Sequence, residues 1–106
     1  MDNKNWNNVK QSNAMSSLIL QINKAILKYK NNYYTENEFQ NSMESISSTI
    51  TENELYEFKS LLRNLDYELE TINFMTDKDL RREEYLLQIN KVEHYLNQFN
   101  DIKQFL

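Results

Sequence analysis

One short phrase occurs three times in this chain, at residues 34–39, 50–55 and 75–80. Each copy has an apolar residue, a threonine, an acid, a variable residue, a second acid and another apolar residue. A threonine at a helix start can accept a hydrogen bond from the backbone N–H three residues later, and the acid there can reach back to the threonine N–H. The phrase is therefore a capping box, with the shorter Asp79 as the second acid of the last copy. Its two apolar residues are placed to touch as a hydrophobic staple. Three helix starts after an initial helix predict four helices.

Glycine, proline and cysteine are all absent from the 106 residues. Without glycine and proline the chain lacks the residues that form tight hairpin turns most readily, which disfavours a β-sheet. The length fits one domain with a single modest core. We predict that the polar, asparagine-rich residues 1–11 form a mobile lead-in and that residues 12–106 form a single helical domain.

Apolar residues at spacings of three and four predict helices over residues 13–30, 36–49, 52–74 and 77–104. The asparagine pair that follows the first of them can end it, because asparagine tolerates the left-handed conformation. The last two helices have the most regular pattern and therefore the clearest candidate core. Its members are Leu55, Phe58, Leu62, Leu65, Leu69 and Ile72 in the third helix, and Tyr85, Ile89, Val92, Leu96 and Phe99 in the fourth.

These helices predict an all-α fold, an antiparallel four-helix bundle with a long hairpin between the third and fourth helices and shorter first and second helices. The link at residues 75–76 is so short that the chain must reverse or bend there at once. The alternative is an open arrangement, in which the links bend and the long helices pair with a second copy of the chain.

The net charge of −4 is unevenly distributed along the chain. Residues 1–30 hold five lysines against one aspartate, which gives +4, and residues 31–106 hold seven bases against fifteen acids, which gives −8. Six glutamates and no lysine or arginine lie between Glu36 and Glu57. Such a surface can attract a basic partner. Four of these glutamates fall in the predicted first turns of helices, where they also complement the helix dipole.

Residues that carry catalytic, metal or phosphate chemistry are scarce. The only histidine, His94, has no partner at metal-ligand spacing, and the chain has neither a thiolate nor a glycine-rich loop. The one compact basic spot, around Arg81 and Arg82, is followed at once by two glutamates, and it is too small for a nucleic-acid footprint. We therefore predict no enzyme, no cofactor or metal site and no nucleic-acid partner.

A recognition surface is the more informative possibility. Tyrosine and arginine dominate binding hot spots, and three such residues fall on one stripe of the third helix at spacings of seven and four, with an acid at either end. A further tyrosine is free to face outward between the first two helices. The predicted partner-binding residues are Tyr33, Tyr56, Glu57, Arg63, Tyr67 and Glu70. The alternative is that these tyrosines cover the core and only their hydroxyls reach water.

The sequence thus predicts a non-enzymatic helical protein–protein interaction module. An acidic inhibitor or immunity-type protein that binds a basic protein partner is its most concrete form. The alternative is a self-associating structural or regulatory subunit, a homodimer in which the third and fourth helices pair between chains. The first residues lack an apolar stretch of signal-peptide length, and the longest strongly apolar run is residues 18–20. We therefore expect a cytoplasmic protein with no membrane partner.

Overall fold

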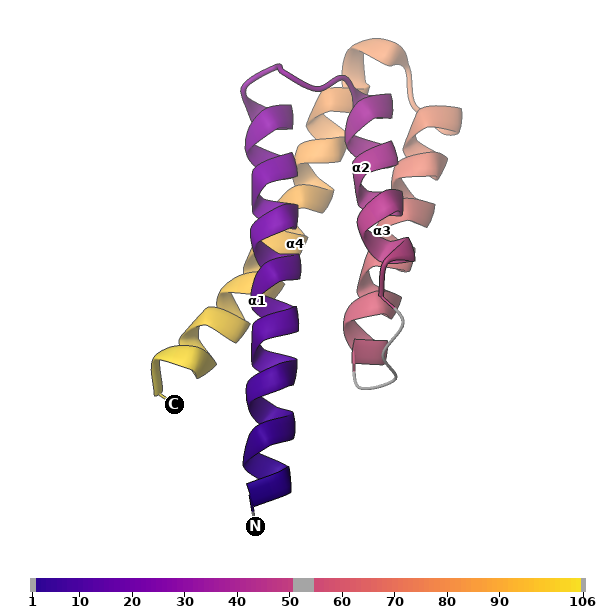
Figure 1. Cartoon of the computed structure of the whole chain (residues 1–106). Helices are drawn as coiled ribbons and strands as arrows, with labels where there is room; N and C mark the ends of the chain where they lie inside the picture. The colour runs from indigo at the N-terminus through magenta and orange to yellow at the C-terminus, as the bar shows by residue number, and fades with distance from the viewer. Residues whose placement is uncertain (1, 51–54, 106) are drawn as a thin grey trace. The chain divides into compact units, whose positions relative to one another are not determined.

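The structure is a computed structural model that describes the backbone of residues 2–50 and 55–105 and the side chains of residues 15–50 and 55–98. Four α-helices and one short 3-10 helix occur in these residues, with no strand among them (Figure 1). This confirms the predicted all-α class, a helical bundle. The elements are α1 (Asp2–Lys30), α2 (Glu36–Ser48), α3 (Tyr56–Met75), η2 (Lys78–Leu80) and α4 (Arg81–Phe105).

The backbone contacts fall into two units, Met1–Asp66 and Tyr67–Leu106, with the boundary inside α3. The first, the N-terminal unit, contains α1, α2 and the first part of α3. The second, the C-terminal unit, contains the end of α3, η2 and α4. The single domain expected for residues 12–106 stays a prediction.

The first helix begins earlier than the sequence pattern indicates. α1 starts at Asp2 rather than at residue 13, and its 29 residues make it the longest of the described helices, about 43 Å at ~1.5 Å per residue. The predictions of a late start and a short first helix are therefore wrong. The physical reason is that neither glycine nor proline interrupts the polar segment, so no strong helix breaker stops the helix there. The mobility expected for residues 1–11 stays a prediction.

The end of α1 depends on one asparagine. Asn32 has a positive φ of 65°, the left-handed conformation that the sequence predicts for the asparagine pair. The N–H of Tyr33 donates to the carbonyl of Lys28 at 2.8 Å, and the N–H of Asn32 donates to the carbonyl of Tyr29 at 3.1 Å. These two bonds form a Schellman motif, which satisfies carbonyls that the end of the helix would leave unpaired.

The first copy of the repeated phrase forms the capping box that the sequence predicts. The N–H of Glu38 donates to the Thr35 hydroxyl oxygen at 3.2 Å. In return, the N–H of Thr35 donates to the Glu38 carboxylate at 3.1 Å. The start of α2 is therefore confirmed at Glu36.

The other two copies have different outcomes. The box at Thr51 lies outside the described residues. At the third copy the predicted cap is wrong: Asp77 precedes η2 without a side-chain cap bond, the N–H of Leu80 donates to the Asp77 carbonyl at 2.9 Å, and α4 begins only at Arg81. The shorter side chain of Asp79 is the difference in this copy, because an aspartate reaches back less far than a glutamate.

The guanidinium of Arg81 stabilises the turn that replaces this third cap. Its Nε donates to the carbonyl of Thr76 at 3.0 Å. Met75 and Leu80, the two expected members of the staple, are 79% and 50% exposed, so they do not form a buried staple.

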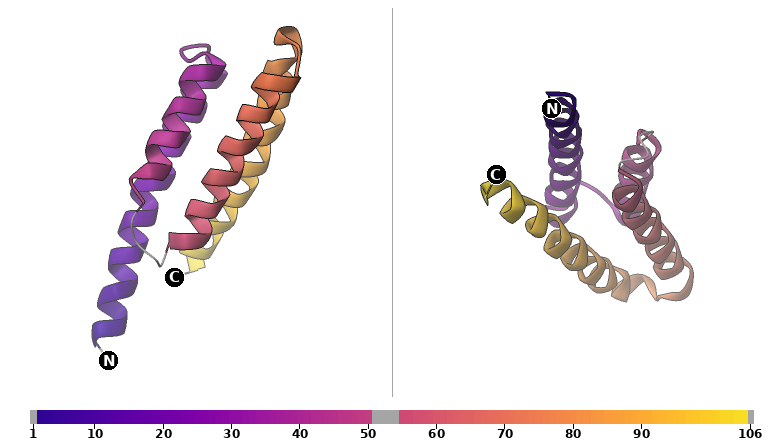
Figure 2. Two further views of the ribbon diagram at one scale, coloured as in Figure 1. Left: turned by 90° about the vertical axis from the view of Figure 1, so that its right-hand side faces the viewer. Right: turned by 90° about the horizontal axis from the view of Figure 1, so that it is seen from below.

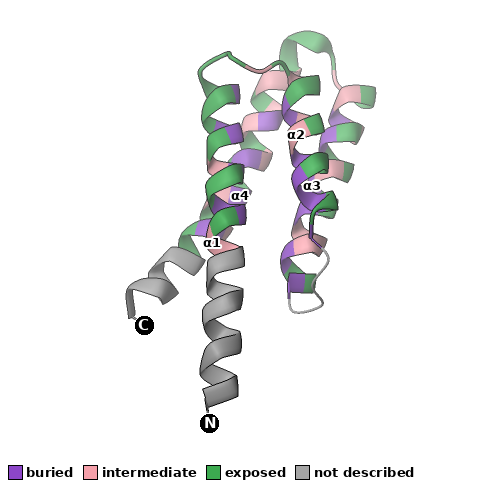
Figure 3. Cartoon of the chain, viewed as in Figure 1, coloured by how far each residue is buried: buried purple, intermediate pink, exposed green. Residues whose placement is uncertain are grey.

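In the N-terminal unit, α1 and α2 pack side by side and run in opposite directions (Figures 1 and 2). Near the turn, the rings of Tyr29 and Phe39 lie with centroids 5.2 Å apart, and the Tyr29 hydroxyl donates to the Glu36 carboxylate at 2.8 Å. Figure 3 shows the buried residues of both helices. They are Leu18, Ile19, Ile22, Ala25, Ile26 and Tyr29 in α1, and Phe39, Met43, Ile46 and Ser47 in α2.

Two hydrogen bonds show that α2 and the first part of α3 also run in opposite directions. The ammonium of Lys59 donates to the carbonyl of Ile50 at 2.8 Å, close to the link between the helices. Far from that link, the Gln40 amide makes a long contact of 3.4 Å with the Asp66 carboxylate. The chain therefore turns back between α2 and α3 and does not continue as a rod.

The core positions predicted for the last two helices are confirmed wherever side chains are described. All six positions of the third helix are buried, from Leu55 to Ile72, and so are Tyr85, Ile89, Val92 and Leu96 of α4. The side chain of Phe99 lies outside the described residues. In the C-terminal unit the chain reverses between Met75 and Arg81, as the predicted hairpin requires (Figure 1).

Matched substitutions test whether the phrase at Thr35 caps a helix and the phrase at Thr76 does not. Thr35→Ala removes a hydroxyl that caps α2, so we expect the free energy of unfolding to fall by about 1 kcal/mol. Thr76→Ala removes no cap, so we expect a change within about 0.5 kcal/mol. Urea unfolding followed by circular dichroism measures both values. Equal losses in the two variants would contradict the assignment of the caps.

Candidate functional site

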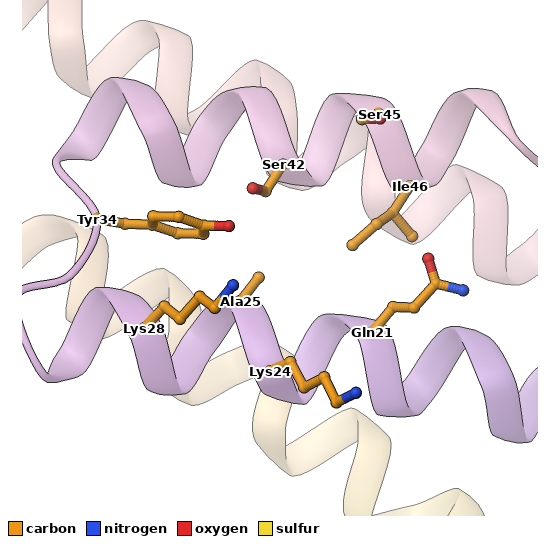
Figure 4. Close-up of a pocket in the computed structure, with 8 residues that line it drawn as sticks. All are labelled: Gln21, Lys24, Ala25, Lys28, Tyr34, Ser42, Ser45 and Ile46. Carbon is orange, nitrogen blue, oxygen red and sulfur yellow. The ribbon is translucent and has the colours of Figure 1, made fainter.

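A small pocket lies between α1 and α2 in the N-terminal unit, with a volume of about 250 Å³ (Figure 4). Its size suits an amino-acid side chain or a small ion rather than a cofactor, since ligand pockets usually measure roughly 300–1,000 Å³. We call it the α1–α2 pocket. Its lining residues are Gln21, Lys24, Ala25 and Lys28 from α1, Tyr34 from the turn, and Ser42, Ser45 and Ile46 from α2.

Helical spacing places these residues on facing sides of the two helices. The four α1 residues span eight positions and recur three and four apart, and the three α2 residues show the same spacing. Alanine and serine at the facing positions are small, which leaves room between the two helices. Tyr34 is placed at one end of the pocket because its N–H donates to the carbonyl of Lys28 at 3.1 Å.

The pocket has a positive character. The ammonium of Lys28 lies 5.3 Å from the centroid of the Tyr34 ring, within the range of a cation–π interaction. Lys24 adds a second charge from the preceding turn of α1, and no acid is among the lining residues.

The Tyr34 hydroxyl points toward Ser42 across the pocket (Figure 4). A hydrogen bond from Ser42 is the largest influence on the Tyr34 hydroxyl and lowers the pKa of Tyr34 from its ordinary value of 10.0. Desolvation and the charge of Glu38 oppose this shift, and the charge and hydrogen bond of Lys28 reinforce it. The Lys28 ammonium and the hydroxyls of Tyr34 and Ser42 therefore lie around one small space, and all three can donate hydrogen bonds (Figure 4).

Sequence reasoning missed this pocket. It interpreted Tyr34, the first residue of the repeated phrase, as a member of a hydrophobic staple. The pocket exists because of the register between α1 and α2, and that register follows from the turn at Asn32. The signal that could have indicated it is the excess of lysine in residues 1–30.

The six residues predicted to bind a partner lie elsewhere, and all are exposed. Tyr33 is in the α1–α2 turn, while Tyr56, Glu57 and Arg63 lie on the part of α3 in the N-terminal unit. Tyr67 and Glu70 lie on the part in the C-terminal unit. None of the six lines the α1–α2 pocket. Their role in binding stays a prediction.

The alternative prediction for these tyrosines is that their rings cover the core and only their hydroxyls reach water. Tyr33, Tyr56 and Tyr67 are 76%, 70% and 68% exposed, whereas Tyr29 and Tyr85 are fully buried. A tyrosine that covers the core keeps its ring against apolar neighbours and only its hydroxyl in water. The three exposed rings are mostly in water, so they contribute little to covering the core.

Large apolar side chains are also exposed at two further places. Leu20 and Leu27 of α1 are 56% and 58% exposed and lie seven residues apart on one face of the helix. The second place is the α3–α4 turn and the helix that follows it. Its members are Phe74, Met75, Leu80 and Leu87.

The described residues contain neither a metal-ligand cluster nor a helix suited to span a membrane. No group of three or more histidines, cysteines, aspartates or glutamates in this part of the chain could hold a metal ion. His94 is exposed on α4. Within the same residues, no helix combines the length and the apolar character needed to cross a membrane.

Comparison with known proteins found no matching family model, no similar curated protein and no similar solved structure.

The electrostatics of the α1–α2 pocket can be tested at Tyr34. We expect its phenol to titrate below pH 10, and Ser42→Ala and Lys28→Gln each to raise its pKa, because each removes a group that stabilises the phenolate. A lowered folded-state pKa also means that ionisation favours the folded chain, an effect that develops as the pH rises through that pKa and is lost below it. Ring ¹³C NMR over a pH series measures these midpoints. Lys30→Gln, a control outside the pocket, should leave the Tyr34 midpoint in place.

Proposed function

We propose that this protein is a helical interaction module that binds another protein through exposed side chains of α3. The α3 stripe comprises Tyr56, Arg63 and Tyr67, which follow one another at spacings of seven and four on one helix. The observation that carries the proposal is the exposure of its two tyrosines, at 70% and 68%.

Without a partner, the side chains of the α3 stripe lie in water. The buried positions of α3 lie on the opposite side of the helix from the stripe, so the stripe contributes little to the core. Moving a large tyrosine ring from water into contact with a partner is favourable, and tyrosine loses little conformational freedom for the contact area it brings. Arginine is enriched with tyrosine among the residues that contribute most to binding. Tyr33, at 76% exposure, offers a similar contact in the α1–α2 turn.

The charges beside the stripe support a basic partner. Glu57 and Glu70 are exposed on α3, and residues 31–106 have a net charge of −8. Complementary charge mainly accelerates association and selects among partners. We therefore propose an acidic inhibitor or immunity-type protein as the specific form of this module. A cytoplasmic location belongs to the same proposal and rests on the sequence alone.

The proposal can be tested by replacing the α3 stripe with alanine. We expect the triple variant Tyr56→Ala, Arg63→Ala and Tyr67→Ala to lose at least about tenfold in affinity for a protein captured from the native source, because hot-spot truncations cost 2 kcal/mol or more. Its melting temperature should stay close to that of the wild type, because exposed substitutions seldom change stability by more than about 0.5 kcal/mol. Quantitative pull-down and thermal unfolding measure the two effects.

A matched control is the double variant Asn64→Ala and Glu68→Ala, which changes exposed α3 residues outside the stripe. This variant should bind as the wild type does. Lost stability in the triple variant would show that the stripe is structural. Unchanged binding in the triple variant would refute the proposed surface.

A self-associating subunit is the second candidate, and one observation favours it. Phe74 is 91% exposed, and Met75, Leu80 and Leu87 near it in the sequence are also at least half exposed. Apolar side chains exposed in this number are typical of surfaces that another chain covers.

Light scattering separates the two candidates. For the interaction module we expect a monomer of 12.9 kDa at micromolar concentration. A stable mass of twice that value, reduced to the monomer mass by Phe74→Ser and Leu87→Ser, would support self-association through α3 and α4 instead.

A further inference from the structure

We propose that the α1–α2 pocket binds a carboxylate of an acidic segment in a partner protein, with Lys28, Tyr34 and Ser42 as its ligands and Lys24 as an additional positive charge beside it. The site does not depend on the α3 stripe. The stripe favours a basic partner, whereas the pocket favours an acidic group.

Hydrogen-bond donors from both helices gather at one end of the pocket. Lys24 and Lys28 line the pocket from successive turns of α1, and the Lys28 ammonium lies near the hydroxyls of Tyr34 and Ser42, whereas the Lys24 ammonium points away from them (Figure 4). A carboxylate has two oxygens that accept hydrogen bonds from ammonium and hydroxyl groups. The volume of about 250 Å³ accommodates a side chain of that size.

The charge around the pocket is positive. Residues 3–35, which include nearly all of α1 and the turn, contain five lysines and no acid. No acid lines the pocket either. Glu38 of α2 also acts on Tyr34, but its effect on the Tyr34 pKa is smaller than that of the Lys28 charge. A negative group in the pocket therefore meets a locally positive environment.

Two exposed leucines of α1 lie on the same helix face as one of the pocket lysines. Leu20 and Leu27, each more than half exposed, lie on the same side of α1 as Lys24. A small inorganic anion would leave these leucines in water. A protein segment that places an acid in the pocket can cover them with apolar side chains at the same time, which favours a peptide as the ligand. The pocket also lacks arginine, the residue that typically holds phosphate with two parallel hydrogen bonds.

The proposal is tested by NMR titration of the full-length, isotope-labelled chain with a capped peptide of alternating glutamate and leucine. We expect saturable shifts of the Tyr34 and Ser42 signals with a dissociation constant near the millimolar range, and a raised Tyr34 pKa in the complex, because a nearby carboxylate disfavours the phenolate. A parallel titration with inorganic phosphate distinguishes a peptide site from a general anion site.

Matched charge variants locate the site. Lys28→Gln should weaken peptide binding about three- to fivefold, as expected for an exposed ion pair, and Lys24→Gln should weaken it less, because the Lys24 ammonium points away from the bound carboxylate. Lys30→Gln makes the same charge change on the same helix outside the pocket and should leave binding within about twofold. Glutamine is nearly as good a helix former as lysine, so all three variants keep α1 intact.

Three results would overturn the proposal. The first is an equal loss of affinity in Lys28→Gln and Lys30→Gln, which would show a diffuse attraction to α1. The second is peptide binding without shifts at Tyr34 and Ser42. The third is phosphate binding as tight as that of the peptide, which would show a small-anion site that makes no use of the leucines.

Discussion

The turn between α1 and α2 is held by backbone hydrogen bonds that require a left-handed residue, and Asn32 supplies it in a chain without glycine. The Schellman motif at this residue ends α1, and the capping box of Thr35 and Glu38 starts α2 five residues after Asn31. Both ends of the link are therefore fixed by specific bonds. The ring contact between Tyr29 and Phe39 depends on the register that results.

The same register produces the positive pocket. It brings Lys28 and Tyr34 together at one end and sets the small side chain of Ser42 opposite them. The α3 stripe arises differently, because its residues follow from the periodicity of a single helix. The protein thus offers two candidate contacts of opposite charge preference, a lysine-lined pocket on α1 and α2 and a tyrosine–arginine stripe bordered by acids on α3. The pocket results from packing between two helices, and the stripe results from residue spacing within a single helix.

The repeated phrase shows which features of the turns local sequence can predict. The copy at Thr35 forms both bonds of a capping box, whereas the copy at Thr76 forms neither. A 3-10 turn takes the place of the cap there, and the Arg81 guanidinium stabilises this turn by donating to the Thr76 carbonyl. The two copies differ at the second acid, where Glu38 has one more methylene than Asp79. A match in pattern therefore predicted the place of the chain reversal correctly in both cases, but it predicted the cap itself only where the side chain was long enough.

By itself, the sequence determined the helical class, the reversals near residues 31–35 and 76–80, and the core positions of α3 and α4, because periodic burial and turn chemistry are local properties. It misplaced the start of α1. A polar segment without glycine or proline is compatible both with a helix and with a lead-in outside the helix, and the sequence does not distinguish the two. Only the tertiary structure decided that Tyr29 and Tyr85 are buried while Tyr33, Tyr56 and Tyr67 remain in water, and that Lys28 faces Ser42 across a pocket. The physical reason is that burial and pocket formation depend on which residues of another helix lie opposite, and spacing along one helix carries no information about that register.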